Sequence, residues 1–280
     1  YVLVVGMPCL CMVFVLCAAS PAEAYVRPYG LNAPWNVPVN NLPKHPQSST
    51  YAERHWNSSP SSRAGNFNVG IYEYTYPVYY ASDAVGEYVV QSSNPTWGNV
   101  HNTKIPYNPA WRANAGTDGQ IIILDPRSGR EWNLWQVSFE NGIVHVSNGN
   151  LVQEGLDSGN GSRPGNYWTK ENGFRSSRGV GIQYLAMLVV PEEVQAGKIE
   201  HALSMPIRNT DGCVYVAPAT KLEFPNHPCN QIPEGMRFAL DVTDAQIQEY
   251  VNSLPTQLTP RMKQLARTMA VALRDYGWII

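Results

Sequence analysis

The chain has 280 residues, of which 15% are charged and 11% aromatic, and its 20 Lys and Arg nearly balance its 22 Asp and Glu. This composition excludes disordered, coiled-coil, collagenous and polytopic membrane proteins. The charge balance leaves no basic surface of the kind that neutralises phosphates, so no nucleic-acid partner is expected. The 22 glycines, 22 prolines and 16 tyrosines favour β-structure joined by many turns.

The chain begins with an apolar segment. Residues 2–19 carry no charge, and Ala22 and Ala24 give the small-residue pattern of a signal-peptide cleavage site. We therefore expect residues 1–24 to be a secretory signal peptide whose basic start lies upstream of Tyr1. The mature chain is then secreted, either extracellular or periplasmic, with no stable membrane span. The alternative is an uncleaved anchor helix, because about 18 apolar residues can just cross a bilayer.

Cleavage would remove 24 of the 280 residues and leave 256, and because only Glu23 is charged among those removed, the formal charge becomes −1. The two cysteines that remain, Cys213 and Cys229, are expected to form a disulfide in an exported protein. Closing a loop of about 15 residues stabilises a fold by roughly 3 kcal/mol in the chain-entropy model. The alternatives are two free thiols or half of a metal site. Only His227 lies close by, so neither a metal ion nor another cofactor is expected.

The mature chain is expected to start with a Pro-rich segment. Residues 25–62 contain six prolines and few periodic apolar positions, which predicts an extended strap on the domain surface. Residues 63–280 are expected to form a single β-rich domain that is truncated at its C-terminus. Its first β-runs are residues 68–74, 76–80 and 87–91, each bounded by Pro, Gly, Asn or Ser.

The clearest local signal is a pair of turns. Residues 125–129 hold the Asp, Pro and Gly that hairpin turns use, between a β-run at 120–124 and another at 130–139. The sequence Glu-Asn-Gly at 140–142 predicts a second turn before the run at 143–146. Together these runs predict a three-stranded meander.

The following part of the chain mixes loops with short elements. Residues 147–178 are dense in Gly, Asn and Ser and too long for a simple connection, so we expect a loop that carries binding residues. Continuous apolar residues at 182–190 favour a buried strand. Residues 191–197 predict one helical turn that ends at a glycine, and residues 199–207 predict a further strand.

Two helices are expected near the end, at residues 244–253 and 259–276. Thr259, followed by Pro, is a good N-cap, and Gly277 stands where a helix commonly ends. Residues 277–280 then open another strand. Apolar residues of the second helix recur at helical spacing, which indicates core packing, with a partner groove as the alternative. They are Met262, Leu265, Ala266, Met269 and Leu273.

The order of these elements defines the expected fold. Many short β-runs bounded by turn residues are typical of a mainly β protein. No internal repeat of 20 to 50 residues is visible, which argues against a solenoid or propeller. We expect an antiparallel β-sandwich, of jelly-roll or concanavalin-like type, with two short C-terminal helices.

Carboxylates are the main candidates for chemistry. The chain lacks the G-x-S-x-G, H-E-x-x-H, P-loop and G-x-G-x-x-G motifs, and its six histidines show no metal-ligand spacing. Asp118 and Asp125 bracket one predicted strand, and Glu131 follows the turn. Glycoside hydrolysis needs such paired carboxyl groups, one as acid and one as base or nucleophile. These three residues, with His201 nearby, are therefore candidate catalytic residues. Alternatively, the two aspartates cap turns and Glu131 is a solvated rim charge.

The strand after the first turn carries candidate binding residues. Period-two alternation puts Glu131, Asn133 and Trp135 on one face and Trp132 and Leu134 on the other. An indole can stack on the C–H face of a sugar while amide and carboxylate groups bond its hydroxyls.

Further binding candidates flank that strand or lie in loops. Together with Asn133 and Trp135, Gln120 is a candidate substrate-binding residue. Trp97, Trp111 and Trp168 lie in predicted loops, where they would form a binding platform for an extended polymer. The alternative is that these tryptophans plug the ends of the sandwich.

A combination of five segments is specific, although each alone is weak: residues 117–120, 125–136, 178–182, 191–203 and 218–221. Together they resemble an uncharacterised family of secreted bacterial proteins that is common in actinobacteria and other soil bacteria. The resemblance extends over residues 32–277 and implies export and a β-rich domain, with no reaction to transfer. Family members usually have His where this chain has Gln120, and they continue past Gly277 with a further strand-rich stretch.

These observations lead to three functional hypotheses. The first is a secreted carbohydrate-active enzyme, a glycoside hydrolase or polysaccharide lyase that uses acidic residues. The second is a non-catalytic module that binds a polysaccharide or cell-surface glycan. The third is a structural protein of the cell envelope. Carboxylates that converge in a cleft favour the enzyme, and a flat aromatic strip favours the module.

Overall fold

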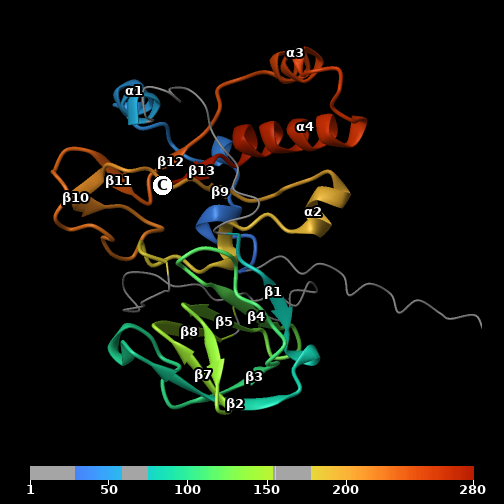
Figure 1. The fold of residues 1–280 in the computed structure, drawn as a ribbon. Coiled ribbons are helices and arrows are strands. Elements are labelled where there is room, and N and C mark those ends of the chain that lie inside the picture. The colour runs from blue at the N-terminus through green and yellow to red at the C-terminus, as the bar shows by residue number, and fades with distance from the viewer. Residues whose placement is uncertain (1–28, 59–74, 154, 156–177) are drawn as a thin grey trace, which may run out of the picture.

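The computed structural model describes residues 29–58, 75–153, 155 and 178–280. The expected signal peptide, the β-run at 68–74, most of the loop at 147–178 and Trp168 therefore lie outside the described residues. Figure 1 shows a strand-rich part built from residues 78–152 and a part that holds the helices and shorter strands. The fold is β-rich and mixed in its strand pairing.

The strand-rich part contains two four-stranded sheets. The first has the order β1 (Val78–Tyr80), β4 (Ile121–Asp125), β5 (Arg130–Trp135) and β8 (Asn148–Val152). The second has the order β3 (Lys104–Tyr107), β2 (Gly86–Ser92), β7 (Ile143–Val146) and β6 (Ser138–Glu140). The pairs β1–β4 and β2–β7 are parallel, so the prediction of purely antiparallel sheets was wrong.

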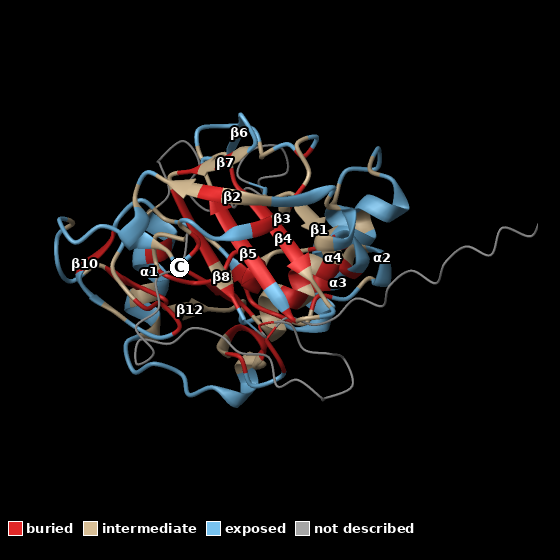
Figure 2. Cartoon of the chain, turned by 90° about the horizontal axis from the view of Figure 1, so that it is seen from below, coloured by how far each residue is buried: buried red, intermediate tan, exposed pale blue. Residues whose placement is uncertain are grey.

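A shared apolar core joins these two sheets. It contains Ile121, Trp132 and Leu134 from the first sheet together with Val90 and Val144 from the second. Figure 2 shows β4 and β5 buried along most of their length. The alternation predicted for residues 131–135 is confirmed, because Trp132 and Leu134 face this core while Glu131 and Asn133 face away from it.

The predicted meander is two separate hairpins. The turn at 125–129 joins β4 to β5, and the turn at 140–142 joins β6 to β7, as expected. However, β5 and β6 belong to different sheets. The chain turns between them at Gln136, which has a positive φ of 54° and whose backbone N–H donates to the carbonyl of Asp118. This left-handed residue redirects the strand into the second sheet.

The other part of the molecule packs helices against two smaller sheets. One sheet pairs β10 (Thr210–Tyr215) with β11 (Ile232–Glu234), and the other has the order β12 (Arg237–Phe238), β13 (Trp278–Ile279) and β9 (Leu203–Ser204). The predicted strand at the end of the chain is thus confirmed as β13. A second apolar cluster lies here and includes Ile199, Ile232 and Trp278.

Three of the helices in the described residues lie close to the predicted ranges, and α1 (Ser48–Ser58) was not predicted. The three are α2 (Pro191–Ala196), α3 (Asp244–Ser253) and α4 (Pro260–Asp275). Thr259 caps α4 by accepting the N–H of Met262, and α2 ends at Gly197 with a left-handed φ of 67°. The stripe on α4 divides, because Met269 and Leu273 pack against the core whereas Met262 and Leu265 are exposed.

Two sequence-based expectations are corrected outside the main sheets. The Pro-rich strap contains helix α1 and a 3₁₀ turn at Pro34–Asn36, and it buries Trp35 in the core, so it is neither wholly extended nor superficial. The apolar run at 182–190 is buried but contains the 3₁₀ turn Leu185–Met187 in place of a strand. Burial on all sides gives the same apolar run in either conformation.

Candidate functional site

The outer face of the β4–β5–β8 sheet carries an unusual number of buried polar side chains. Asn133 pairs with Asn150, and Trp135 pairs with Asn148, so these four side chains share one face. The register continues to Gln120, which lies beside Trp135 just before β4. All of them except Trp135 are buried. Such groups need hydrogen-bond partners to be stable inside a protein.

One end of this face is closed by the chain itself. Glu131 is fully buried, and its carboxylate accepts hydrogen bonds from the Tyr29 hydroxyl, the Asn133 amide at 2.6 Å and the Leu185 backbone N–H at 3.3 Å. The Asn133 carbonyl accepts the backbone N–H of Tyr184 at 2.6 Å. Burial raises the pKa of Glu131, while these hydrogen bonds act in the opposite direction. Glu131 is thus neither a solvated rim charge nor an accessible catalytic group.

The other candidate acids also separate. Asp125 accepts the backbone N–H of Arg127 at 3.1 Å and the hydroxyl of Ser128, which is the turn-capping role. Asp118 lies before the other end of β4. Four steps of about 3.3 Å span that strand, so the two aspartates are more than about 13 Å apart and cannot act as a pair.

His201 belongs to a structural pair. It is buried, with Nδ1 at 2.8 Å from the carbonyl of Ala202 and Nε2 at 3.2 Å from Oε2 of Glu193. The same Glu193 oxygen accepts the backbone N–H of Val190 at the start of α2. Both ring nitrogens are therefore used to hold α2 in place, and His201 does not contact Asp118, Asp125 or Glu131.

Three predicted residues do come together at the opposite end of the sheet face, which we call the open end because the described residues leave some of its amide atoms unbonded. Nε2 of Gln120 donates to Oδ2 of Asp118 at 3.1 Å, and Nε1 of Trp135 lies 3.4 Å from Oδ1 of the same carboxylate. Gln120 is only 5% exposed, and its Oε1 has no hydrogen-bond partner among the described residues. A buried acceptor is therefore present beside Asp118 and an indole ring.

Gln183 adds a second unbonded amide. It is 0% exposed, and neither Nε2 nor Oε1 has a partner within the described part of the chain. The backbone N–H groups of Leu185 and Tyr184 bond Glu131 and Asn133, so Gln183 is the next residue of the segment that covers this face. From this order we infer that Gln183 lies toward the Trp135 end. We call Gln120, Gln183 and Asn148, with Asp118 and Trp135, the amide site. The sequence signal for Gln183 was a single amide inside an apolar run.

The carboxyl group of Glu223 interacts electrostatically with Asp118. The carboxyl of Glu223 lies against Gly179, where an added Cβ would be 2.0 Å from its carbon. Partial desolvation raises the pKa of Glu223, and the charges of Glu234 and, more weakly, Asp118 raise it further. The acidic group whose charge couples to Asp118 is therefore Glu223. No local sequence pattern marks it.

Of the loop tryptophans in the described residues, Trp111 plugs the core, whereas Trp97 is exposed as a binding platform would require. Trp111 is buried and stacks on Tyr79 with ring centroids 4.7 Å apart, so it plugs the core. Trp97 is 53% exposed. It directly precedes Gly98, where an added Cβ would be 2.6 Å from the side-chain Oδ1 of Asn148. Trp97 is therefore an exposed residue whose neighbour in the chain borders the amide site.

The cysteines lie in the other part of the molecule. The sulfur atoms of Cys213 and Cys229 are at bonding distance, as expected. Asp211 holds this region by accepting backbone N–H groups of Cys213, Val214 and Gln231. Within residues 29–58, 75–153 and 178–280, no three His, Cys, Asp or Glu side chains gather as metal ligands would.

Comparison of the chain with protein-family models, with curated proteins and with solved structures finds no match. Across the described residues, none of the helices combines the length and apolar character that a bilayer span requires. The residues of the amide site are therefore the basis for inferring its chemistry.

Proposed function

We propose that this protein is exported and binds a polysaccharide or cell-surface glycan at the amide site. The observation that carries the proposal is the pair of buried glutamines, because among the described residues two amide atoms of Gln183 and one of Gln120 find no partner. Leaving such a group unbonded costs about 1–3 kcal/mol. A ligand that brings both donors and acceptors into the site would recover that free energy.

Sugars supply the matching chemistry. Each hydroxyl both donates and accepts, so neighbouring hydroxyls can bond the N–H and C=O of one amide. Trp135 offers an indole beside Asp118, and the exposed Trp97 directly precedes Gly98, which borders Asn148. Aromatic faces of this kind pack on the C–H faces of sugar rings. The bonded pair Cys213–Cys229 supports export, because disulfides persist in oxidising compartments.

The two four-stranded sheets give the site its frame. They share one apolar core, and we propose that they form a small sandwich of mixed strand direction. The amide site then lies at one end of the outer face of this sandwich. Sheet strands are rigid, so they hold the amides in fixed positions before a ligand arrives.

Binding is tested by titrating the full chain with neutral hexasaccharides of glucose, xylose, mannose and N-acetylglucosamine. We expect at least one to bind and Gln183→Leu to weaken that binding at least tenfold without loss of stability, because leucine removes the unbonded amide but keeps the volume. Gln195→Leu, on the exposed side of α2, is the matched control and should bind as the parent does. Equal affinities for the parent and Gln183→Leu would contradict the proposal.

A second candidate function is hydrolysis of the bound glycan. It is favoured by Glu223, whose pKa is raised by partial desolvation and by Glu234 and Asp118. Glycoside hydrolases use one protonated carboxylic acid to protonate the leaving oxygen and a second carboxylate as base or nucleophile. Glu223 would be the acid and Asp118 its partner.

Product formation separates the enzyme from the binding module. In a hydrolase, Glu223→Gln and Asp118→Asn abolish the release of new reducing ends while the oligosaccharide still binds. A lyase would instead yield unsaturated ends. Binding with neither product identifies a non-catalytic module.

A further inference from the structure

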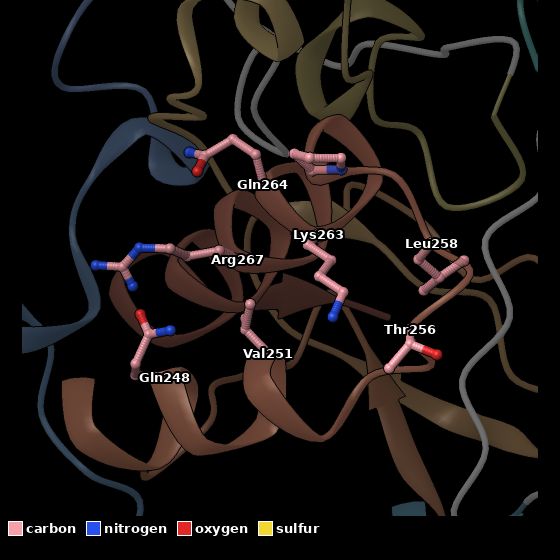
Figure 3. A pocket seen from close by; sticks show the side chains of 8 residues that line it. Gln248, Val251, Thr256, Leu258, Lys263, Gln264 and Arg267 are labelled. Carbon is pink, nitrogen blue, oxygen red and sulfur yellow. The ribbon is translucent and has the colours of Figure 1, made fainter.

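A pocket of about 640 Å³ lies between α3 and the first half of α4, away from the amide site. Figure 3 shows side chains of both helices and of the loop between them around it. The residues from α4 recur at helical spacing, so one face of that helix forms a wall. The lining residues are Gln248, Val251, Thr256, Leu258, Pro260, Lys263, Gln264 and Arg267.

The charge of this pocket is uniformly positive. Lys263 and Arg267 lie four residues apart on the same face of α4, and none of the described residues that line the pocket carries a carboxylate. Like charges at this spacing destabilise a helix. The pocket also opens at the start of α4, where the helix dipole adds partial positive charge. A bound anion would offset both effects.

The two cations differ in how they are bonded. Nζ of Lys263 donates to the carbonyl of Leu254 at 3.3 Å. Nη1 of Arg267 is buried and has no hydrogen-bond partner among the described residues. A guanidinium donor that is shielded from water and unbonded is unfavourable unless an acceptor is supplied.

The acidic residue whose charge couples to Arg267 does not supply that acceptor. Asp244 is exposed, and its Oδ1 accepts from Nη1 of Arg274 at 2.7 Å. The hydrogen bond and charge of Arg274 lower the pKa of Asp244 most, and Arg267 contributes a smaller part through charge alone. Asp244 therefore balances some of the charge of Arg267 without occupying its free N–H.

We propose that the α3–α4 pocket binds an oxyanion, a carboxylate or phosphate group on a partly apolar body. The planar guanidinium of Arg267 would bond its oxygens. Figure 3 shows Lys263 extending in a different direction, toward Thr256, so its ammonium would add positive charge to the pocket. Gln248, Gln264 and Thr256 provide neutral polar partners. Val251, Leu258 and Pro260 provide an apolar wall for the rest of the ligand. The inference is independent of glycan binding at the amide site.

The test uses inorganic phosphate and benzoate as probes on the full chain, with sodium chloride at the same ionic strength as the control. We expect phosphate or benzoate to raise Tm in a saturable way beyond chloride, and calorimetry to give the affinity. Binding of one probe alone assigns the group as phosphate or carboxylate, and binding of both assigns a general oxyanion site.

Variants locate the effect in the pocket. Arg267→Gln should weaken binding roughly tenfold or more, the scale of one charge-assisted hydrogen bond, and Lys263→Gln provides a second variant if the first does not fold. Arg261→Gln is the matched control, because Arg261 is exposed on the same helix and does not line the pocket. The proposal is overturned if neither probe exceeds chloride, or if Arg261→Gln loses as much affinity as Arg267→Gln.

Discussion

At one end of the β4–β5–β8 face, Glu131 and Asn133 are enclosed by hydrogen bonds from their own chain. At the other end, Gln120 and Gln183 keep buried amide atoms that have no partner among the described residues. Both ends derive from the same alternation of polar residues along neighbouring strands. They differ in what covers them, and that difference separates a structural network from a ligand site.

The contrast has a general consequence for assigning function. A carboxylate such as Glu131 is readily chosen from a sequence as a catalytic candidate, yet it is hydrogen-bonded within the protein and its removal should affect folding. A buried amide whose atoms lack partners among the described residues is less readily chosen, yet its removal should affect binding. Substitutions at the closed end should therefore change the free energy of unfolding, and substitutions at the open end should change the affinity for glycan.

The largest effect is expected at the closed end. Glu131→Ala should lower the free energy of unfolding by about 3 kcal/mol or more, because it removes the buried acceptor of three hydrogen bonds, from Tyr29, Asn133 and Leu185, and opens a cavity. Urea denaturation at neutral pH measures this loss. A change below about 1 kcal/mol would mean that the network is not a stabilising unit.

A loss of roughly 3 kcal/mol is expected from the double change Cys213→Ser and Cys229→Ser, which opens a loop between residues 16 positions apart. This disulfide lies in the other part of the molecule, so glycan affinity at a temperature where the variant remains folded should stay as in the parent. The variant is thus a control for destabilisation without a change of the site. Reduced affinity in the folded variant would show that the two parts are coupled.

The pH dependence of stability provides a third comparison. Because burial raises the pKa of Glu131 above its ordinary value of 4.5, the folded state holds this proton more tightly than the unfolded state. Its contribution is fully present below pH 4.5 and is lost as pH rises through the folded pKa, with a slope of at most about 1.4 kcal/mol per pH unit. Glu131→Gln should remove this part of the profile. An unchanged profile in denaturant titrations would contradict a raised pKa.

The smallest effect in free energy is expected at the open end. Gln120→Met should weaken glycan binding about tenfold, or about 1.4 kcal/mol, because it removes one amide from the site while keeping its volume. Stability should change by less than about 1 kcal/mol, since only the bond to Asp118 is lost. Calorimetric titration and urea denaturation of the same sample measure both quantities. A large loss of stability would place Gln120 with the structural network.

Local elements of this fold could be predicted from the sequence. Capping chemistry is contained in a few neighbouring residues, so Thr259 and Gly197 marked the limits of α4 and α2. Which sheet a strand joins is decided by distant contacts. The separation of β5 from β6 depends on the left-handed Gln136, which no local pattern predicts, so the meander was predicted instead.

For the candidate site, the sequence predicts which residues share one face of the sheet but not what covers them. Alternation placed Asn133 and Trp135 together, and the turn signal placed Gln120 beside them. The burial of Glu131 depends on Tyr29, which is 102 residues away in the chain, so no local pattern could reveal it. Gln183 was visible as one amide in an apolar run, and a polar residue at such a position is itself informative.

We propose that Gln120 and Gln183, whose buried amides keep atoms without a partner among the described residues, contact a glycan. The direct measurement is ¹H–¹⁵N NMR of side-chain amide groups while the full chain is titrated with the hexasaccharide that binds best. The NH₂ signals of Gln120 and Gln183 should shift together and saturate, while that of Asn133, already bonded to Glu131, stays in place. Saturated binding with no shift of either glutamine signal would contradict the account.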